Sequence, residues 1–322
     1  MKQDKYFLHG VRTAKKPWTH LDFGDRGGGL DFSFGIVSDR TGRFRAGVFE
    51  NAIAILNRMR PDFVMSVGDF IEGVCLEDQS ERFLRAEWAR IRPEIEKSIP
   101  PFFYVAGNHD FSEPGANRVF PGLHERSKTI WNSMFGTDHY WFIYKKVLFL
   151  CLNSSAADSG LGKAQIRWAL DTIAAHADVR WTFVFLHRPD IWDSPDFKPI
   201  EDALYERNYT VFSGDRHSYA KYVRNGRKYI MLGTTGAGDV RVGQGARGVP
   251  FGEFDHITWV SMCGERPETT IIALDGIYDE NVVTTEKITW LTPKYFRANK
   301  KISPTEAKRL RAAGIEIEET EF

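Results

Sequence analysis

Short apolar runs alternate with longer amphipathic segments from Phe32 onward. The short runs have the length and composition of buried strands. Strands are therefore predicted over residues 32–38, 63–67, 102–106, 147–152, 181–186, 210–213 and 229–233. Apolar residues spaced three and four apart predict helices over residues 49–59, 81–99 and 163–175, and Pro93 is expected to kink or divide the second of these.

Two further apolar runs, 258–263 and 269–274, follow each other with no helix between them and are predicted to pair as antiparallel strands. The alternation over most of the chain predicts an α/β layered domain across residues 32–276. Residues 1–31 are polar and glycine-rich, and they are expected to form an N-terminal arm on the domain surface. Residues 277–322 are expected to form a C-terminal extension, with a strand over 282–290 and a helix over 305–313.

The composition is that of an ordinary globular protein. The chain has 322 residues, of which 42% are hydrophobic and 27% charged. Lys+Arg and Asp+Glu both count 43, so the formal net charge is zero. The net charge therefore does not favour a nucleic acid or an anionic membrane as partner. We see no signal peptide and no membrane-spanning run, and the three cysteines are scattered. A cytoplasmic location is therefore expected.

Five of the predicted strands end abruptly in a side chain that can bind a metal ion. These side chains are Asp39, Asp69, Asn108 with His109, His187, and Asp215 with His217. A single such residue is common as a helix cap or turn residue. Five in chain order, several with glycine just before them, indicate instead a site at the carboxyl ends of the strands, where ligands gather in open α/β sheets.

The motifs around these side chains resemble those of the calcineurin-like metallophosphoesterase superfamily. The family pattern is D-x-H, G-D-x-x-D/E, G-N-H-D/E, a lone histidine and G-H-x-H. The corresponding residues here are Asp39-Arg40-Thr41, Gly68-Asp69 with Glu72, Gly107-Asn108-His109-Asp110, His187, and Gly214-Asp215-Arg216-His217. The resemblance covers about residues 32–275. It implies a four-layer α/β/β/α sandwich of two mixed sheets.

The resemblance also implies a centre that holds two divalent metal ions. Asp69 would bridge the ions, since one carboxylate can give an oxygen to each. Asp39 and His217 would bind the first ion, and Asn108 and His187 the second. The family role implied for His109, with Asp110 holding it, is to protonate the leaving oxygen or to stabilise charge.

Two positions depart from the family pattern. The histidine of D-x-H is Thr41 here, and the first histidine of G-H-x-H is Asp215. Asp215 can replace an imidazole nitrogen with an anionic oxygen, which favours Mn²⁺, Mg²⁺ or Fe²⁺ over Zn²⁺. Because Thr41 is a poor ligand, the first site is expected to be the weaker one. The predicted cofactor is therefore one or two divalent ions.

Arginines stand inside both altered motifs, at Arg40 and Arg216. A planar guanidinium group suits contact with phosphate oxygens, but both residues can equally pair with neighbouring carboxylates. Pairing is the expectation for Arg188, which follows His187. Glu72 is expected to accept hydrogen bonds beside the ligands or to cap a helix rather than to bind metal.

The function predicted from these features is metal-dependent hydrolysis of a phosphate ester by metal-activated hydroxide. A diester or a small organophosphate is favoured, because no substrate-docking module, helix-turn-helix or RNP motif is recognised. Two alternatives stay open: a mononuclear or chemically altered hydrolase of the same fold, and a non-catalytic member that binds a metal or ligand. Thr41 and Asp215 keep them open.

Overall fold

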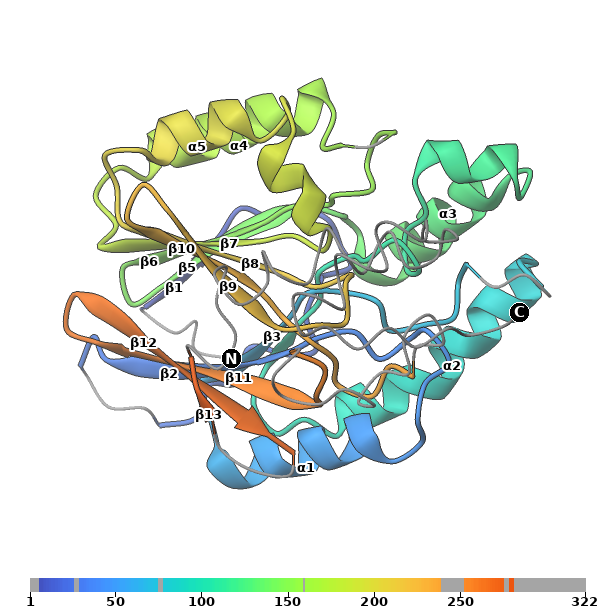
Figure 1. Ribbon diagram of the computed structural model, residues 1–322, viewed down its shortest axis with the longest axis horizontal. Helices are drawn as coiled ribbons and strands as arrows, with labels where there is room; N and C mark the ends of the chain where they lie inside the picture. Colours follow the sequence, from blue (N-terminus) through green and yellow to red (C-terminus); the bar gives the residue numbers. More distant parts are fainter. Residues whose placement is uncertain are drawn as a thin grey trace, which may run out of the picture.

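The computed structural model describes residues 6–25, 29–74, 78–158, 160–238, 252–274 and 278–280. Two β-sheets lie face to face, and helices cover the outer face of each (Figure 1). The chain thus forms the four-layer α/β/β/α sandwich that the motifs imply. The predicted strand 282–290 and helix 305–313 lie outside the described residues. No helix in the described part of the chain is long and apolar enough to cross a membrane.

One sheet has seven strands in the order β1-β5-β6-β7-β8-β10-β9. Neighbouring strands from β6 to β10 are parallel, whereas β1, β5 and β9 pair in antiparallel fashion. The bounds are β1 (Phe7–His9), β5 (Tyr140–Tyr144), β6 (Val147–Cys151), β7 (Trp181–Phe185), β8 (Tyr209–Ser213), β9 (Ala220–Arg224) and β10 (Arg227–Met231).

The other sheet has six strands in the order β13-β12-β11-β2-β3-β4. The three early strands are parallel to one another. Strand β11 pairs antiparallel with β12, as the late apolar runs predict, and also antiparallel with β2. The bounds are β2 (Phe32–Val37), β3 (Phe63–Ser66), β4 (Phe102–Phe103), β11 (His256–Cys263), β12 (Arg266–Ala273) and β13 (Tyr278–Asp279).

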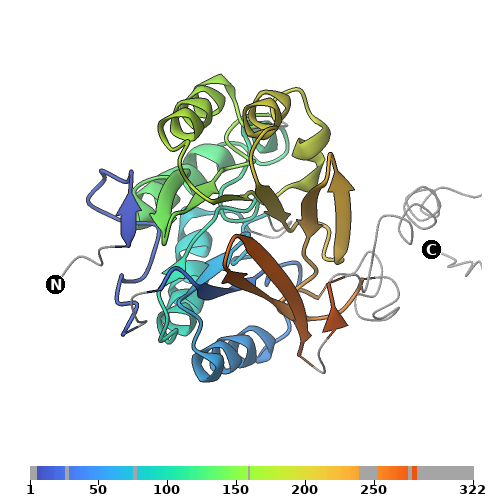
Figure 2. The same cartoon turned by 90° about the vertical axis from the view of Figure 1, so that its left-hand side faces the viewer.

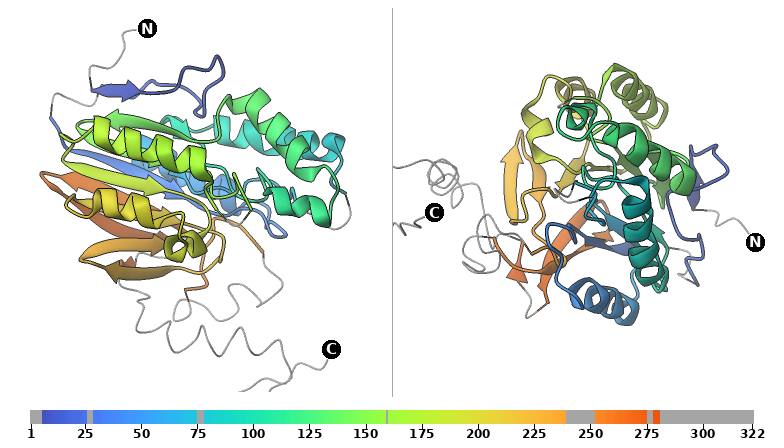
Figure 3. Two further views of the ribbon diagram at one scale, coloured as in Figure 1. Left: turned by 90° about the horizontal axis from the view of Figure 1, so that it is seen from above. Right: turned by 90° about the vertical axis from the view of Figure 1, so that its right-hand side faces the viewer.

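Amphipathic helices pack their apolar stripes on the outer faces of the two sheets. The six-stranded sheet carries α1 (Val48–Met59), α2 (Glu81–Glu96) and α3 (Leu123–Phe135), and the seven-stranded sheet carries α4 (Lys163–Ala175) and α5 (Lys198–Leu204), which lie side by side in Figure 3. The expected division of α2 at Pro93 is wrong. The helix continues through the proline, because Trp88, Ile91 and Ile95 are all buried on one face.

A layer of aromatic rings fills the space between the two sheets. The Phe34 ring of β2 lies 5.4 Å from the Phe63 ring, and it lies 5.3 and 5.1 Å from the Phe149 and Phe183 rings of the opposite sheet. Such pairs stabilise beyond the area that they bury. The sheets are therefore held in one relative orientation, which places the loops after β2, β3, β7 and β8 at a common rim.

The N-terminal segment differs from the surface arm expected from its polar composition. Strand β1 extends the edge of the seven-stranded sheet beside β5 (Figure 2), and the side chains of Phe7, Trp18 and Phe23 are buried in the core between the sheets. A few widely spaced apolar residues are enough to anchor a segment that is polar elsewhere.

Candidate metal centre

Glycines let the loops at this rim approach one another closely. A Cβ atom on Gly68 would lie 2.4 Å from the backbone nitrogen of Gly107, and one on Gly214 would lie 2.3 Å from Oδ2 of Asp39. Real Cβ contacts are never so short. Gly68, Gly107 and Gly214 are therefore required by close approach of neighbouring loops, and the loops after β2, β3, β4 and β8 meet at one point.

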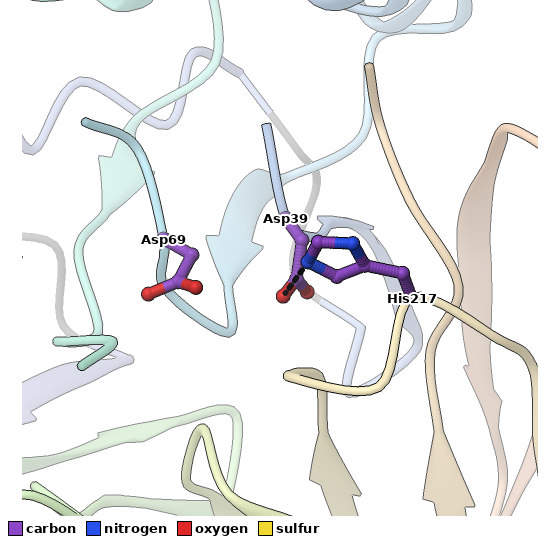
Figure 4. Close-up of side chains that lie close together, drawn as sticks. All are labelled: Asp39, Asp69 and His217. Atoms are coloured by element: carbon purple, nitrogen blue, oxygen red, sulfur yellow. Dashed lines mark ion pairs between the residues drawn. The ribbon is translucent and has the colours of Figure 1, made fainter. Parts of the chain in front are cut away.

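Three of the predicted ligands come together in the structure: Asp39 after β2, Asp69 after β3 and His217 after β8 (Figure 4). Their ligand atoms all lie within 4.8 Å of one another, and all three residues are buried. Nε2 of His217 lies 3.3 Å from Oδ1 of Asp39. Two carboxylates and an imidazole in this arrangement can hold a divalent cation.

His187 forms a second group with the same Asp69. Its Nε2 lies 3.2 Å from Oδ2 of Asp69 and 3.7 Å from Oδ1 of Asp215. Its Nδ1 lies 2.8 Å from the carbonyl oxygen of Val67. In the neutral ring that can bind a metal ion, a proton on Nδ1 would donate to that carbonyl and Nε2 would keep a lone pair toward the carboxylates. Asn108 follows β4, and within the described structure its buried Oδ1 accepts no hydrogen bond.

The charges of the site are tightly coupled. Burial alone would lower the pKa of the His187 imidazole, but the carboxylates of Asp69, Asp39 and Asp215 raise it well above its usual value. Burial opposes ionisation of Asp69, yet His187 and His109 hold its pKa below the ordinary range. Burial raises the pKa of Asp215, and the charges of His187 and Arg216 counteract that shift. The site thus concentrates negative charge that a cation can neutralise.

Asp110 has a different place from the one implied by the resemblance. Its carboxylate accepts hydrogen bonds from the backbone N–H groups of Asp69, Phe70, Ile71 and Gly107, at 2.7 to 3.3 Å. Burial and the Asp69 carboxylate raise the pKa of Asp110 to about 8. In the described structure the buried Nδ1 of His109 makes no hydrogen bond. Asp110 therefore joins the loops after β3 and β4 rather than holding the His109 ring.

His109 itself is partly exposed at the rim, and its backbone N–H donates to Oδ1 of Asp69 at 3.0 Å. Asp69, Asp215 and His217 have left-handed φ values of 62°, 69° and 53°. Non-glycine residues rarely adopt this conformation, which costs about 1–3 kcal/mol and gathers at functional sites. The backbone N–H groups of Asp69 and Asp215 donate to the carboxylates of Asp110 and Asp39, which helps to hold these two residues in that conformation.

The two motif arginines have different positions. Arg40 is buried, its guanidinium donates to the carbonyl oxygen of Phe70 at 2.9 Å, and it stacks on the Phe44 ring at 4.2 Å. It is therefore a structural residue rather than a phosphate clamp. Arg216 is 42% exposed, and its Nε lies 3.4 Å from Oδ2 of Asp215. Arg188 pairs with carboxylates, as expected, but its partners are Glu113 and Asp190 rather than residues of the motifs.

Thr235 is a supporting residue that the sequence analysis did not identify. Its hydroxyl accepts from the backbone N–H of Ser38 at 3.1 Å and donates to the carbonyl of His256 at 3.0 Å, while its own N–H donates to the carbonyl of Asp39 at 2.9 Å. These bonds hold the chain around Asp39. The only signal in the sequence is a polar pair, Thr234-Thr235, after a predicted strand.

The residues present fit divalent metal. Asp39, Asp69 and His217 converge with ligand atoms close enough to share one ion. The buried Oδ1 of Asn108, which has no hydrogen-bond partner among the described residues, is a further neutral oxygen donor. Thr41 is fully buried, and its Oγ1 has no hydrogen-bond partner among the described residues. Most of the candidate ligand atoms are oxygens, and the imidazoles of His187 and His217 supply the nitrogen donors.

Fold and site together define a four-layer α/β/β/α sandwich with a buried cluster of carboxylates and histidines at one rim. Residues 19–219, more than half of the chain, match the family model of the calcineurin-like phosphoesterases. The chain belongs to the calcineurin-like phosphoesterase family and is, by family, a hydrolase of phosphoric ester bonds.

Solved structures show the same fold. A dimetal phosphatase from Danio rerio is 12% identical, with a TM-score of 0.52, and the match covers 75% of this chain and 95% of that one. GAP50, described as the anchor in the inner membrane complex of Plasmodium, is 14% identical, with a TM-score of 0.53 and coverage of 83% and 94%. At these identities the likeness concerns the fold alone.

Proposed function

We propose that this phosphoesterase is metal-dependent and hydrolyses a diester or another small organophosphate at a centre for two divalent ions. The observation that carries the proposal is the position of Asp69. Its carboxylate is shared by two groups of ligand atoms, Asp39 with His217 and His187 with Asp215. A shared carboxylate is the feature that a two-metal centre needs. Deep burial of these atoms favours a phosphoryl group that is presented by a small molecule.

When bound, two divalent ions would clamp the phosphoryl oxygens and supply a hydroxide nucleophile near neutral pH. Asp39, Asp69 and His217 would hold the first ion. Asp69, Asn108, His187 and Asp215 would hold the second. Oxygen-rich ligand sets favour Mn²⁺, Mg²⁺ or Fe²⁺ over Zn²⁺.

Two residues at the rim would act on the substrate itself. The backbone N–H of His109 donates to the Asp69 carboxylate, which places this residue beside the centre. Its side chain would protonate the leaving oxygen or stabilise its charge. Arg216, exposed beside Asp215, would contact the phosphoryl oxygens. A one-metal hydrolase is the second candidate function, because Thr41 stands where the family pattern has a histidine ligand.

The test is the metal content of protein purified without chelator and then reloaded with Mn²⁺, followed by turnover on a panel of diesters and monoesters. We expect close to two ions per chain. Asp69→Asn should lose bound metal and turnover, because the shared charge is removed. Asp202→Asn, an exposed carboxylate paired with Lys198 on the outer helix α5, is the matched control and should change neither.

One ion per chain, lost in Asp69→Asn, would support the one-metal candidate. Undiminished turnover in Asp69→Asn would contradict both candidates. Failure to bind any ion after reloading would contradict them too.

A further inference from the structure

The loop between β2 and α1 forms one wall of the candidate metal centre. It carries Asp39 and Thr41, and the backbone N–H groups of Arg40 and Thr41 both donate to the carbonyl oxygen of Asp69, at 3.0 and 3.1 Å. Gly42 lies directly against the His217 ring, since a Cβ atom on Gly42 would be 2.7 Å from Cε1 of that ring. The path of this loop therefore decides where Asp39, Asp69 and His217 stand relative to one another.

The loop has neither helix nor strand to fix that path. Gly42 and Arg43 both adopt positive φ values, 95° and 63°. Outside a helix or strand, the N–H groups of Gly42 and Phe44 need an acceptor from another part of the chain. Without an acceptor, the part-buried N–H groups of Gly42 and Phe44 would lose their hydrogen bonds when the loop folds.

Glu72 supplies that acceptor with both of its oxygens. Oε2 accepts from the N–H of Gly42 at 3.2 Å, and Oε1 accepts from the N–H of Phe44 at 3.0 Å. Hydrogen bonds to an ionised carboxylate are stronger than those between neutral groups. Because both oxygens are engaged by the loop, Glu72 acts as an acceptor beside the ligands and not as a ligand itself.

Glu72 is in turn held in place by α2. Its backbone N–H donates to Oε2 of Glu87 at 3.2 Å, and the same carboxylate pairs with Arg90 at 2.7 Å. The guanidinium groups of Arg40 and Arg90 both stack on the Phe44 ring, at 4.2 and 4.0 Å. The loop is thus held between the segment after Asp69 and helix α2. The Glu72 carboxylate makes the hydrogen bonds to the loop backbone.

We infer that Glu72 is a positioning residue for the first metal ion: it acts through the backbone of Gly42 and Phe44 to keep the His217 ring and Asp39 at binding distance. The inference rests on the proposed function for the existence of that ion. Thr41 makes this dependence stronger. Thr41 stands where the family pattern has a histidine, so the first site has one ligand fewer. Displacement of Asp39 or His217 would therefore weaken it more.

The experiment is a calorimetric titration of the chelator-treated protein with Mn²⁺, with EPR of bound Mn²⁺ as an independent readout. Asp39→Asn identifies the ion at the first site, since Asp69 and His187 remain for the second. In Glu72→Gln, one oxygen that accepts an N–H becomes an NH₂ group that repels it. We expect affinity for the first ion to fall about tenfold or more, the range for residues that support ligands. Affinity for the second ion should stay unchanged.

Glu81→Gln is the matched control. Glu81 lies on the same helix α2 as Glu87 and makes an exposed pair with Arg85, so the change of charge is the same without any contact to the loop. Circular dichroism checks that each variant is folded. Should Glu72→Gln not fold, Glu72→Asp keeps the charge but shortens the reach, and affinity for the first ion should again fall. Raising the Mn²⁺ concentration should restore turnover in either variant, and circular dichroism at each concentration distinguishes this from a rise in the folded fraction.

The inference and the proposed function fail in different ways. If the wild-type protein binds no Mn²⁺ that depends on Asp39, the two-metal function fails and the inference with it. If wild type binds that ion and Glu72→Gln binds it as tightly as Glu81→Gln does, the inference alone is overturned.

Discussion

At the scale of single residues, buried polar groups in the site do several things at once. Asp69 has a left-handed backbone, its carbonyl accepts two N–H groups from the neighbouring loop, and its carboxylate faces both His187 and the N–H of His109. Asp110 accepts the N–H of Asp69 and so helps to keep it in that conformation. The chemistry of the site is therefore inseparable from the hydrogen bonds of its backbone.

His256 is a buried histidine close to this site whose titration can be tested. It begins β11, and its ring packs against the rings of Tyr219 and Phe254 at 5.6 and 4.9 Å. Burial lowers the pKa of His256 to about 4 from an ordinary value of 6.5. Above pH 6.5 the ring is neutral in both the folded and the unfolded chain. Below it, the unfolded chain takes up the proton first, so stability falls until about pH 4.

The prediction is that His256→Phe loses less stability on acidification than wild type. With 1.36 kcal/mol per pKa unit, the wild-type free energy of unfolding should fall by about 2 kcal/mol more than that of the variant between pH 7 and pH 5. Urea unfolding at the two pH values measures this difference. Other titrating groups are common to both proteins and cancel. Equal losses in the two proteins would show that His256 is protonated in the folded state at pH 5.

At the scale of elements, the strands deliver the polar side chains and the glycines let the loops meet. Gly68 shows this most directly, because its φ of 104° and the nearness of Gly107 both exclude a side chain. Gly214 has the same role beside Asp39 on the opposite sheet. The glycines before Asp69, Asn108 and Asp215 are therefore part of the geometry of the candidate site and not a feature of turns alone.

Replacing Gly68 with alanine should destabilise the fold and displace Asp69. The added Cβ would lie 2.4 Å from a backbone nitrogen, which has to shift. We expect the cost to exceed 3 kcal/mol, at the upper end for single substitutions, together with loss of bound Mn²⁺. Gly226→Ala is the control, since Gly226 also has a positive φ but no atom within 4 Å of an added Cβ. It should cost only about 1–2 kcal/mol in urea unfolding. Similar losses in both variants would contradict the role of close loop approach.

At the scale of the whole molecule, the candidate site exists because two sheets are stacked in one orientation. Asp39 and Asp69 follow strands of the six-stranded sheet, whereas His187 and His217 follow strands of the seven-stranded sheet. The aromatic layer between the sheets fixes their separation. Phe63 is central to it, with ring contacts of 5.4 Å to Phe34 in its own sheet and 5.2 Å to Phe149 in the other.

Phe63→Ala should therefore weaken both stability and metal binding, although it lies outside the site. Loss of a buried phenylalanine costs about 3–5 kcal/mol, and partial collapse of the sheets onto the cavity would move the ligands of one sheet relative to those of the other. Urea unfolding and Mn²⁺ titration test both effects. Tyr205→Ala, which removes a ring that is 57% exposed, should change neither. Normal Mn²⁺ affinity in a destabilised Phe63→Ala would show that the loops hold the site without the core.

Local patterns determined much of the fold before any contact was known. The strand ends that carry Asp39, Asp69, His187 and Asp215, the helix over 163–175 and the late antiparallel pair all follow from the spacing of apolar residues. Weaker patterns were missed. Helix α3 has His124 and Ser127 at buried positions, which interrupts its apolar stripe, and α5 is only seven residues long. The edge strands β1 and β9 are short and only partly buried.

The sequence by itself determined which strands end in a side chain of a type that can bind metal, because residue type and apolar spacing are local properties of the chain. Only the tertiary structure decided what supports these side chains. Arg40 turned out to stack on Phe44, Asp110 to join two loops, and Thr235 to bind Ser38 from 197 residues away. A side chain's partner depends on how two sheets pack and where distant loops meet, and no pattern along the chain contains that information.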